Sequence, residues 1–183
     1  MIKHSAFFLA FVILMTICSA AKADTVIIQD ELSGIMHFSG FAISNPDGST
    51  TFWGLTYIGD VISGNLPDRW AVILRTLYPQ NADEGDVLGF FAVGDLEKDA
   101  VYGRITGIIN PAAGSFSFGI AIGGGIGSFE GFTGVGIFTG TLTNEGEDID
   151  GTLFLVCNNE QTGRPRSKLN KEDNGNPALL LLD

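Results

Sequence analysis

Glu130 is the residue of this chain best suited to acid–base chemistry. It lies in the segment Gly127–Gly134, flanked by Phe129 and Phe132. A carboxylate held in an apolar cavity has a raised pKa and can donate or accept a proton during a reaction. Glu130 is therefore the candidate catalytic residue. The alternative interpretation is a carboxylate that points outward from the rim of the fold.

Tyr102, Arg104 and His37 are the candidate ligand-binding residues. Tyr102 and Arg104 stand two positions apart in a strand-like run, so their side chains share one face and could together orient a polar group of a ligand. An ordinary external strand face is the alternative. His37 lies between Met36 and Phe38, where it is either a general base or a hydrogen-bonded structural residue.

The sequence offers no metal or cofactor site of a usual kind. It contains 2 Cys and 2 His, and only Cys157 and His37 lie beyond the first 23 residues. A zinc site of the usual type therefore lacks ligands, so we expect no metal and no cofactor. Cys157 ends an apolar run and is predicted to be buried and inert. The net charge of −11 argues against nucleic acid as a partner.

The N-terminal 23 residues have the pattern of a secretory signal peptide. Lys3 precedes an apolar core, Ala6–Ile17, and Ala21 and Ala23 supply the small residues before a cleavage site. The core is shorter than the roughly 20 residues that a membrane span needs, so the mature chain is predicted to begin near Asp24 without a span. This indicates a secreted or periplasmic protein.

Short apolar runs separated by turn residues predict an all-β domain over residues 24–158. Residues 159–183 are mostly polar and are predicted to form a flexible C-terminal tail. One run, residues 66–78, fits a helix beginning after Asp68 as well as a strand, and we favour the strand. The expected strands are Val26–Gln29 with Met36–Ile43, Thr50–Ile58, Trp70–Leu77, Val87–Val93, Val101–Ile109, Ser115–Ile122, Gly134–Leu142 and Gly151–Cys157.

Glycines recur inside the strand-like segment Gly119–Thr143, where glycine normally weakens a strand. A series of such glycines is a way to curve a sheet tightly enough to close a barrel. The run Val87–Val93 adds a second signal, because neither of its faces is polar. A barrel can bury only one of these faces, so the other is expected to be covered by another copy of the chain or by the tail.

The segment Gly127-Ser-Phe-Glu-Gly-Phe-Thr-Gly134, followed by two strands that end at Cys157, resembles the glycine–phenylalanine signature of the allene oxide cyclase and dirigent barrels. The resemblance implies a closed antiparallel eight-stranded barrel with an apolar cavity, typically trimeric. It covers residues 124–157, and the polar residues of the cyclase reaction have no match here. It therefore bears on the fold more than on the activity.

Three functions are compatible with these observations. The first is a secreted or periplasmic barrel that binds a hydrophobic small molecule in its cavity. The second is an isomerase or cyclase of the allene oxide cyclase type, and the third is a non-catalytic structural or interaction barrel. In each case a homo-oligomer is expected, with a trimer favoured. Inward polar groups would indicate the enzyme, and large inward side chains would indicate the interaction barrel.

Overall fold

The computed structural model describes residues 25–66 and 69–159. The predicted signal peptide and nearly all of the predicted tail lie outside the described residues. The described part contains nine strands and two short 3-10 turns, η1 (Gly127–Phe129) and η2 (Asn144–Gly146). The strands are β1 (Thr25–Phe38), β2 (Phe41–Ser44), β3 (Thr50–Ser63), β4 (Arg69–Tyr78), β5 (Gly85–Asp95), β6 (Asp99–Asn110), β7 (Ser115–Ile126), β8 (Phe132–Thr143) and β9 (Asp148–Asn159).

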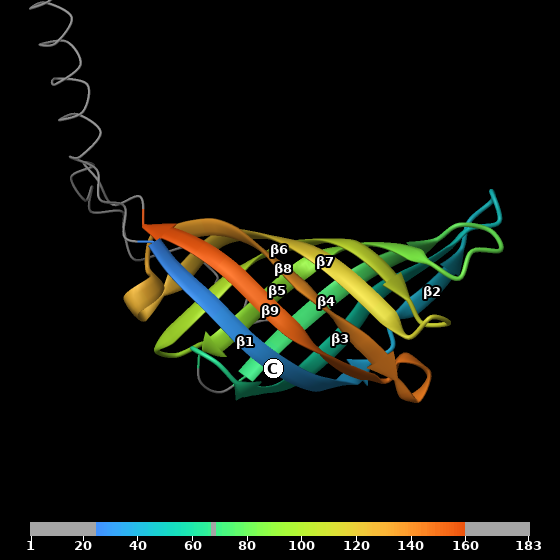
Figure 1. Ribbon diagram of the computed structural model, residues 1–183. Helices are drawn as coiled ribbons and strands as arrows, with labels where there is room; N and C mark the ends of the chain where they lie inside the picture. Colours follow the sequence, from blue (N-terminus) through green and yellow to red (C-terminus); the bar gives the residue numbers. More distant parts are fainter. Residues whose placement is uncertain (1–24, 67–68, 160–183) are drawn as a thin grey trace, which may run out of the picture.

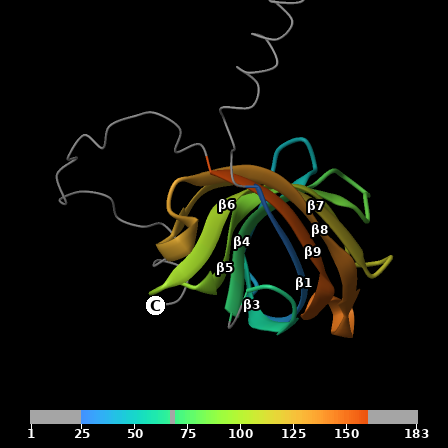
Figure 2. The same ribbon diagram turned by 60° about the vertical axis from the view of Figure 1, so that its left-hand side comes forward.

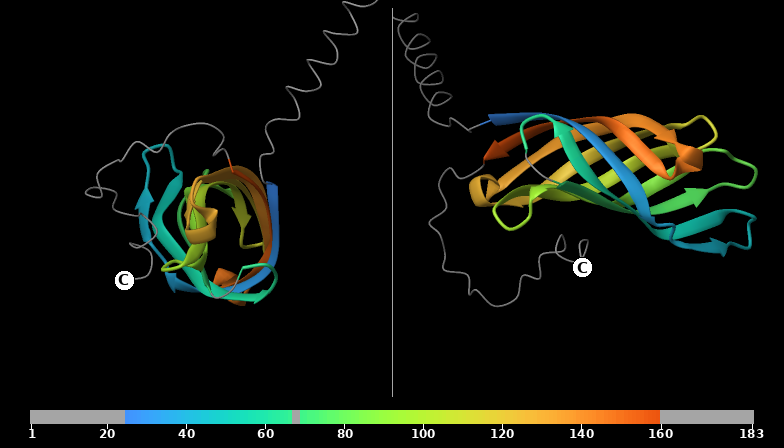
Figure 3. Two further views of the ribbon diagram at one scale, coloured as in Figure 1. Left: turned by 90° about the vertical axis from the view of Figure 1, so that its left-hand side faces the viewer. Right: turned by 90° about the horizontal axis from the view of Figure 1, so that it is seen from below.

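Eight of the strands close into an antiparallel barrel. Their order is β1-β9-β8-β7-β6-β5-β4-β3, and β1 pairs with β3 to complete the ring (Figures 1 and 2). The end-on view in Figure 3 shows this ring, with β2 and the adjoining part of β3 standing apart from it. The predicted closed eight-stranded all-β barrel is thus confirmed, with β2 as one extra strand. No helix in the described residues is long and apolar enough to cross a membrane.

We call the end of the barrel at which β1 begins the near rim, and the opposite end the far rim. The near rim holds the start of β1, the end of β9, the β3–β4 loop, the β5–β6 turn and η1. The far rim holds the end of β1, the β2–β3 hairpin and η2. In that hairpin the Asn45 N–H donates to the Ser49 carbonyl across the turn (2.8 Å).

The strand prediction for residues 70–77 is correct. The first predicted strand is wrong in two ways, because it omits residues 30–35 and because it runs through residues 39–40, where the structure separates β1 from β2. β1 continues without interruption across residues 30–35, which are polar enough to resemble a loop. All of these residues pair with β9, and residues 31–35 also pair with β3, so the ladders supply their backbone hydrogen bonds. Residues 30–35 therefore form a strand because of their pairing in the barrel, although their composition resembles that of a loop.

Inward-facing glycines bring neighbouring strands close together. At eight of them, a Cβ atom would collide with a backbone carbonyl oxygen of the adjacent strand, so any side chain would push the strands apart. Gly134, from the predicted series, would meet the Val156 carbonyl oxygen in this way. The same holds for Gly59, Gly89, Gly103, Gly107, Gly136, Gly140 and Gly151.

Candidate functional site

Aromatic side chains meet across the middle of the barrel. Trp70 on β4 and Phe138 on β8 come from strands that are four places apart around the eight-stranded ring, and their ring centroids are 5.4 Å apart. Phe138 also contacts Phe116 (4.7 Å) and Phe118 (6.2 Å). All four side chains are buried. The interior that could have held a ligand is thus occupied by large side chains of the protein itself.

Each rim holds a buried group that connects a loop or turn to the barrel. At the near rim, Leu66 of the β3–β4 loop is buried in the main core cluster. At the far rim, the buried Tyr57 hydroxyl donates to the Gly146 carbonyl at 2.6 Å, and burial raises the pKa of this tyrosine well above its ordinary value. Tyr57 is therefore a neutral hydrogen-bond donor that joins β3 to η2.

Asp30 is a buried carboxylate that the sequence analysis did not select. Its side chain faces inward from β1 and is 1% exposed. Oδ1 accepts hydrogen bonds from the N–H groups of Asn65 and Leu66, while Oδ2 is buried without a partner among the described residues. The Asn65 side chain in turn accepts a hydrogen bond from the Gln29 N–H (2.9 Å). Asp30 thus fastens the β3–β4 loop over the near rim.

Burial raises the pKa of Asp30 above its ordinary value, against the opposing effect of the two backbone hydrogen bonds. The signal that could have identified Asp30 was its position in the sequence. It alternates with Ile28 and Leu32, which are the inward apolar residues of β1.

Asp30→Asn is expected to change how stability depends on pH. A carboxylate whose pKa is raised by folding stabilises the folded state most when it is protonated, so this contribution is lost as pH rises through the raised pKa. Asn keeps the oxygen that accepts the loop hydrogen bonds but cannot ionise. Urea unfolding at pH 4 and pH 7 should show that the variant gains stability over wild type between the two values. The exposed Asp86→Asn is the control, and an equal gain there would contradict the assignment.

Two of the predicted site residues lie at one hollow on the outer wall. Tyr102 and Glu130 line a space of about 490 Å³, together with residues 123–127 and 131–133. The hollow forms because the β7–β8 ladder ends at the pair Ile122–Gly134, beyond which the two strands separate. Glu130 is exposed there, and its N–H donates to the Gly127 carbonyl at 3.2 Å. Glu130 therefore does not lie in the apolar cavity considered for it from the sequence, but at an exposed position.

The other predicted ligand-binding residues do not join Tyr102 and Glu130 at this hollow. Arg104 is exposed on the outer face of β6, on the same side as Tyr102. His37 is exposed at the far rim, in an irregularity between Met36 and Phe38. The four residues thus occupy outward or rim positions, and their roles in binding or catalysis stay predictions.

No protein-family model, curated protein or solved structure matches this chain. The resemblance to allene oxide cyclases and dirigent proteins therefore stays a prediction, and every candidate site has to be judged by its own geometry.

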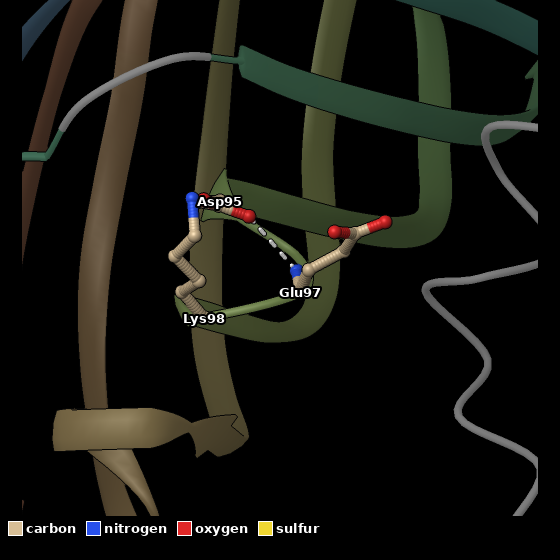
Figure 4. A network of polar contacts seen from close by, with 3 residues as sticks. All are labelled: Asp95, Glu97 and Lys98. Carbon is tan, nitrogen blue, oxygen red and sulfur yellow. Dashed lines mark hydrogen bonds and ion pairs between the residues drawn. The ribbon is translucent and has the colours of Figure 1, made fainter.

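A second hollow, of about 590 Å³, lies at the near rim and is lined in part by Asp60, Arg69, Asp95 and Glu97. Figure 4 shows that Asp95 accepts a hydrogen bond from the Glu97 N–H (3.0 Å). Lys98 Nζ lies 2.8 Å from Asp95 Oδ2, and this hydrogen bond is the main reason why the pKa of Asp95 is below its ordinary value. These contacts stabilise the β5–β6 turn. Within residues 25–66 and 69–159, no three His, Cys, Asp or Glu side chains are grouped to hold a metal ion.

Apolar side chains from β1, β3, β4 and β5 lie in neighbouring cross-strand rows on the outer wall. Ile35, Phe38, Leu88 and Phe90 are exposed there, whereas Ala71 and Ala92 are buried. In one cross-strand row, Phe38 pairs with Thr56, Thr56 with Ile73, and Ile73 with Phe90. In the next row, Ile35, Ile58, Ala71 and Ala92 are neighbours in the same way. We call this surface the apolar wall, defined by Ile35, Phe38, Ile58, Ile73, Leu88 and Phe90.

The two-sided apolar character of Val87–Val93 now has a structural explanation. Val87, Gly89, Phe91 and Val93 face inward, whereas Leu88, Phe90 and Ala92 face outward. Phe90 is 49% exposed and Leu88 is 44% exposed. Large apolar side chains in such numbers on one wall are typical of an interaction surface.

Proposed function

We propose that this protein is a non-catalytic interaction barrel that acts outside the cytoplasm and associates with copies of itself through the apolar wall. The observation that carries the proposal is the contact between Trp70 and Phe138 across the barrel. A filled interior is what the interaction barrel requires, and the exposed apolar side chains lie on the outside instead. The signal-peptide pattern of residues 1–23 supports the location.

Binding of a hydrophobic small molecule inside the barrel, the first function considered from the sequence, would require these rings to move. A ligand would have to separate Trp70 from Phe138 and replace contacts that close packing already provides. The cyclase function would additionally need polar groups directed into the interior. Asp30 is such a group, but its Oδ1 already holds the β3–β4 loop. The interior therefore favours the interaction barrel over both alternatives.

Association through the apolar wall is favourable because it removes apolar area from water. Full burial of an exposed large side chain contributes about 1.5–3 kcal/mol, and the wall side chains, which are already about half-buried, contribute part of this before the entropic cost of association is subtracted. The wall offers several such side chains in adjacent cross-strand positions. The resemblance to allene oxide cyclases suggests a trimer as the number of copies.

Phe90→Glu is expected to reduce the mass of the assembly. It places a charge on the β5 side of the wall and leaves the core intact, because Phe90 faces outward. The control is Val135→Glu, which changes a residue that is 65% exposed on β8, across the barrel from β4. In sedimentation velocity at micromolar concentration, wild type and Val135→Glu should share one larger mass. Equal masses for wild type and Phe90→Glu would contradict the proposal.

The alternative to self-association is that the chain's own C-terminal segment, which includes Leu179–Leu182, covers the apolar wall. Sedimentation of chains with and without residues 160–183 separates the two occupants. The truncation starts after Asn159 because β9 extends to that residue. A full chain that is monomeric and associates only after truncation would assign the wall to the tail. Monomers in both cases would overturn self-association.

A further inference from the structure

β2 is the one strand of the described structure with a single neighbour. Every other strand pairs on both sides within the closed ring, whereas β2 pairs only with β3. It projects past the far rim, as Figures 1 and 3 show. All four of its residues, Phe41–Ser44, are exposed. An open strand edge presents unpaired N–H and C=O groups and is a template for pairing with another strand.

The register of the β2–β3 hairpin identifies which backbone groups lie on this edge. The Asn45 N–H donates to the Ser49 carbonyl, which makes these two residues a hydrogen-bonded pair. Hydrogen-bonded and non-hydrogen-bonded pairs alternate along an antiparallel ladder. The pairs of Ile43 with Thr51 and of Phe41 with Trp53 are therefore hydrogen-bonded to β3.

It follows that Ala42 and Ser44 direct their N–H and C=O groups toward the open edge. Natural proteins protect such edges by keeping the strand short, as β2 is with four residues, and by charged residues, proline or bulges. The four residues of β2 include no charge and no proline. Their apolar members are also unusually accessible, since Phe41 is 68% exposed and Ile43 is 50% exposed.

We propose that β2 pairs antiparallel with β2 of a second copy, across a two-fold axis at Ile43. In this register Ala42 of each copy faces Ser44 of the other, so all four edge residues exchange backbone hydrogen bonds. The axis makes Ile43 and its symmetry mate a non-hydrogen-bonded pair, in which Cα atoms are typically about 4.5 Å apart. A strand pairing of this kind is self-complementary, which is what a two-fold interface requires. The second copy is therefore the occupant that the edge fits.

This interface adjoins the apolar wall at Phe38, whose ring contacts the ring of Phe41 on β2 (5.5 Å between centroids), but it is formed by backbone groups of β2 and not by the outer face of β5. Pairing at an edge extends the sheet sideways and leaves the outer face of β5, with Leu88 and Phe90, uncovered. The edge interface therefore goes beyond the proposed function, and either can fail without the other. If both interfaces exist, pairing of β2 joins two assemblies, and within each assembly the copies contact one another through the apolar wall.

Ala42→Pro tests the edge pairing. Proline removes the N–H that faces the open edge, while the ladder bonds to β3 at Phe41 and Ile43 remain. Ala42→Val, which keeps the N–H, is the control. We expect the sedimenting mass of Ala42→Pro to be half that of wild type and of Ala42→Val. Phe90→Glu alone should then be a dimer, and the double variant a monomer. Equal masses for Ala42→Pro and Ala42→Val would overturn the edge interface without affecting the wall.

Ile43→Cys gives a second readout that does not depend on mass. Under mild oxidation, a cysteine at the axis should form a disulfide-linked dimer, because its symmetry mate lies within disulfide range. The native Cys157 is buried, and burial raises the pKa of its thiol, so it does not compete. Val135→Cys is the control for random collision. Cross-linking of Ile43→Cys that is no faster than that of Val135→Cys would overturn the proposed register.

Discussion

Phe138→Ala is expected to lower the free energy of unfolding by about 3–5 kcal/mol, the range typical of deleting a buried aromatic side chain. Phe138 is 1% exposed and packs against Trp70, Phe116 and Phe118. Because its contacts come from strands on both sides of the barrel, neighbouring groups cannot easily move into the space that it leaves. Urea unfolding followed by Trp fluorescence measures the loss.

The matched control for Phe138→Ala is Phe154→Ala, which removes a ring that is partly exposed on the outer face of β9. The control should cost much less, because Phe154 leaves no internal cavity when truncated. If both variants lost the same small amount, below about 1 kcal/mol, the interior would have room to rearrange. That result would favour the hydrophobic-ligand function over the interaction barrel.

Gly134→Val is expected to destabilise the barrel by about 1–3 kcal/mol or more, as overpacking does, although valine favours ordinary strands. A Cβ at Gly134 would overlap the Val156 carbonyl oxygen and would stand 3.0 Å from the Cys157 Cα. Both atoms belong to the backbone of β9, so relief would require the two strands to separate. Thermal unfolding should therefore show a lower midpoint than for wild type.

Gly119→Val provides the comparison for Gly134→Val. Gly119 lies on β7, next to β8, and a Cβ there would be 3.6 Å from the Thr106 carbonyl oxygen, an ordinary contact. Its substitution should be neutral or slightly stabilising. A rise in the midpoint for Gly134→Val would show that β8 tolerates side chains on its inner face, and that glycine is not required there for curvature.

The sequence was sufficient to predict the class of fold because its signals are local. Turn residues such as Asn45-Pro46-Asp47-Gly48 end strands wherever they occur, and they mark the observed β2–β3 hairpin. Glycines repeated in apolar runs indicated curvature for the same reason. The apolar residues on both sides of Val87–Val93 predicted that one row would face outward, and the row of Leu88 and Phe90 does so.

The direction of individual side chains was decided by tertiary structure. Trp53 and Leu55 share a parity in the sequence, but the irregularity at Gly54 turns Trp53 outward and Leu55 inward. The open edge of β2 likewise depends on where β1 ends along β3, which no local pattern specifies.

The filling of the barrel could be seen only in three dimensions. Trp70 and Phe138 are far apart in the chain, and their contact depends on barrel closure and strand tilt. Asp30 is buried for the same reason, because closure of β1 against β3 brings the loop N–H groups of Asn65 and Leu66 to its carboxylate. Local sequence thus determined strands and turns, whereas ring closure determined which residues form the interior and which remain available to a partner.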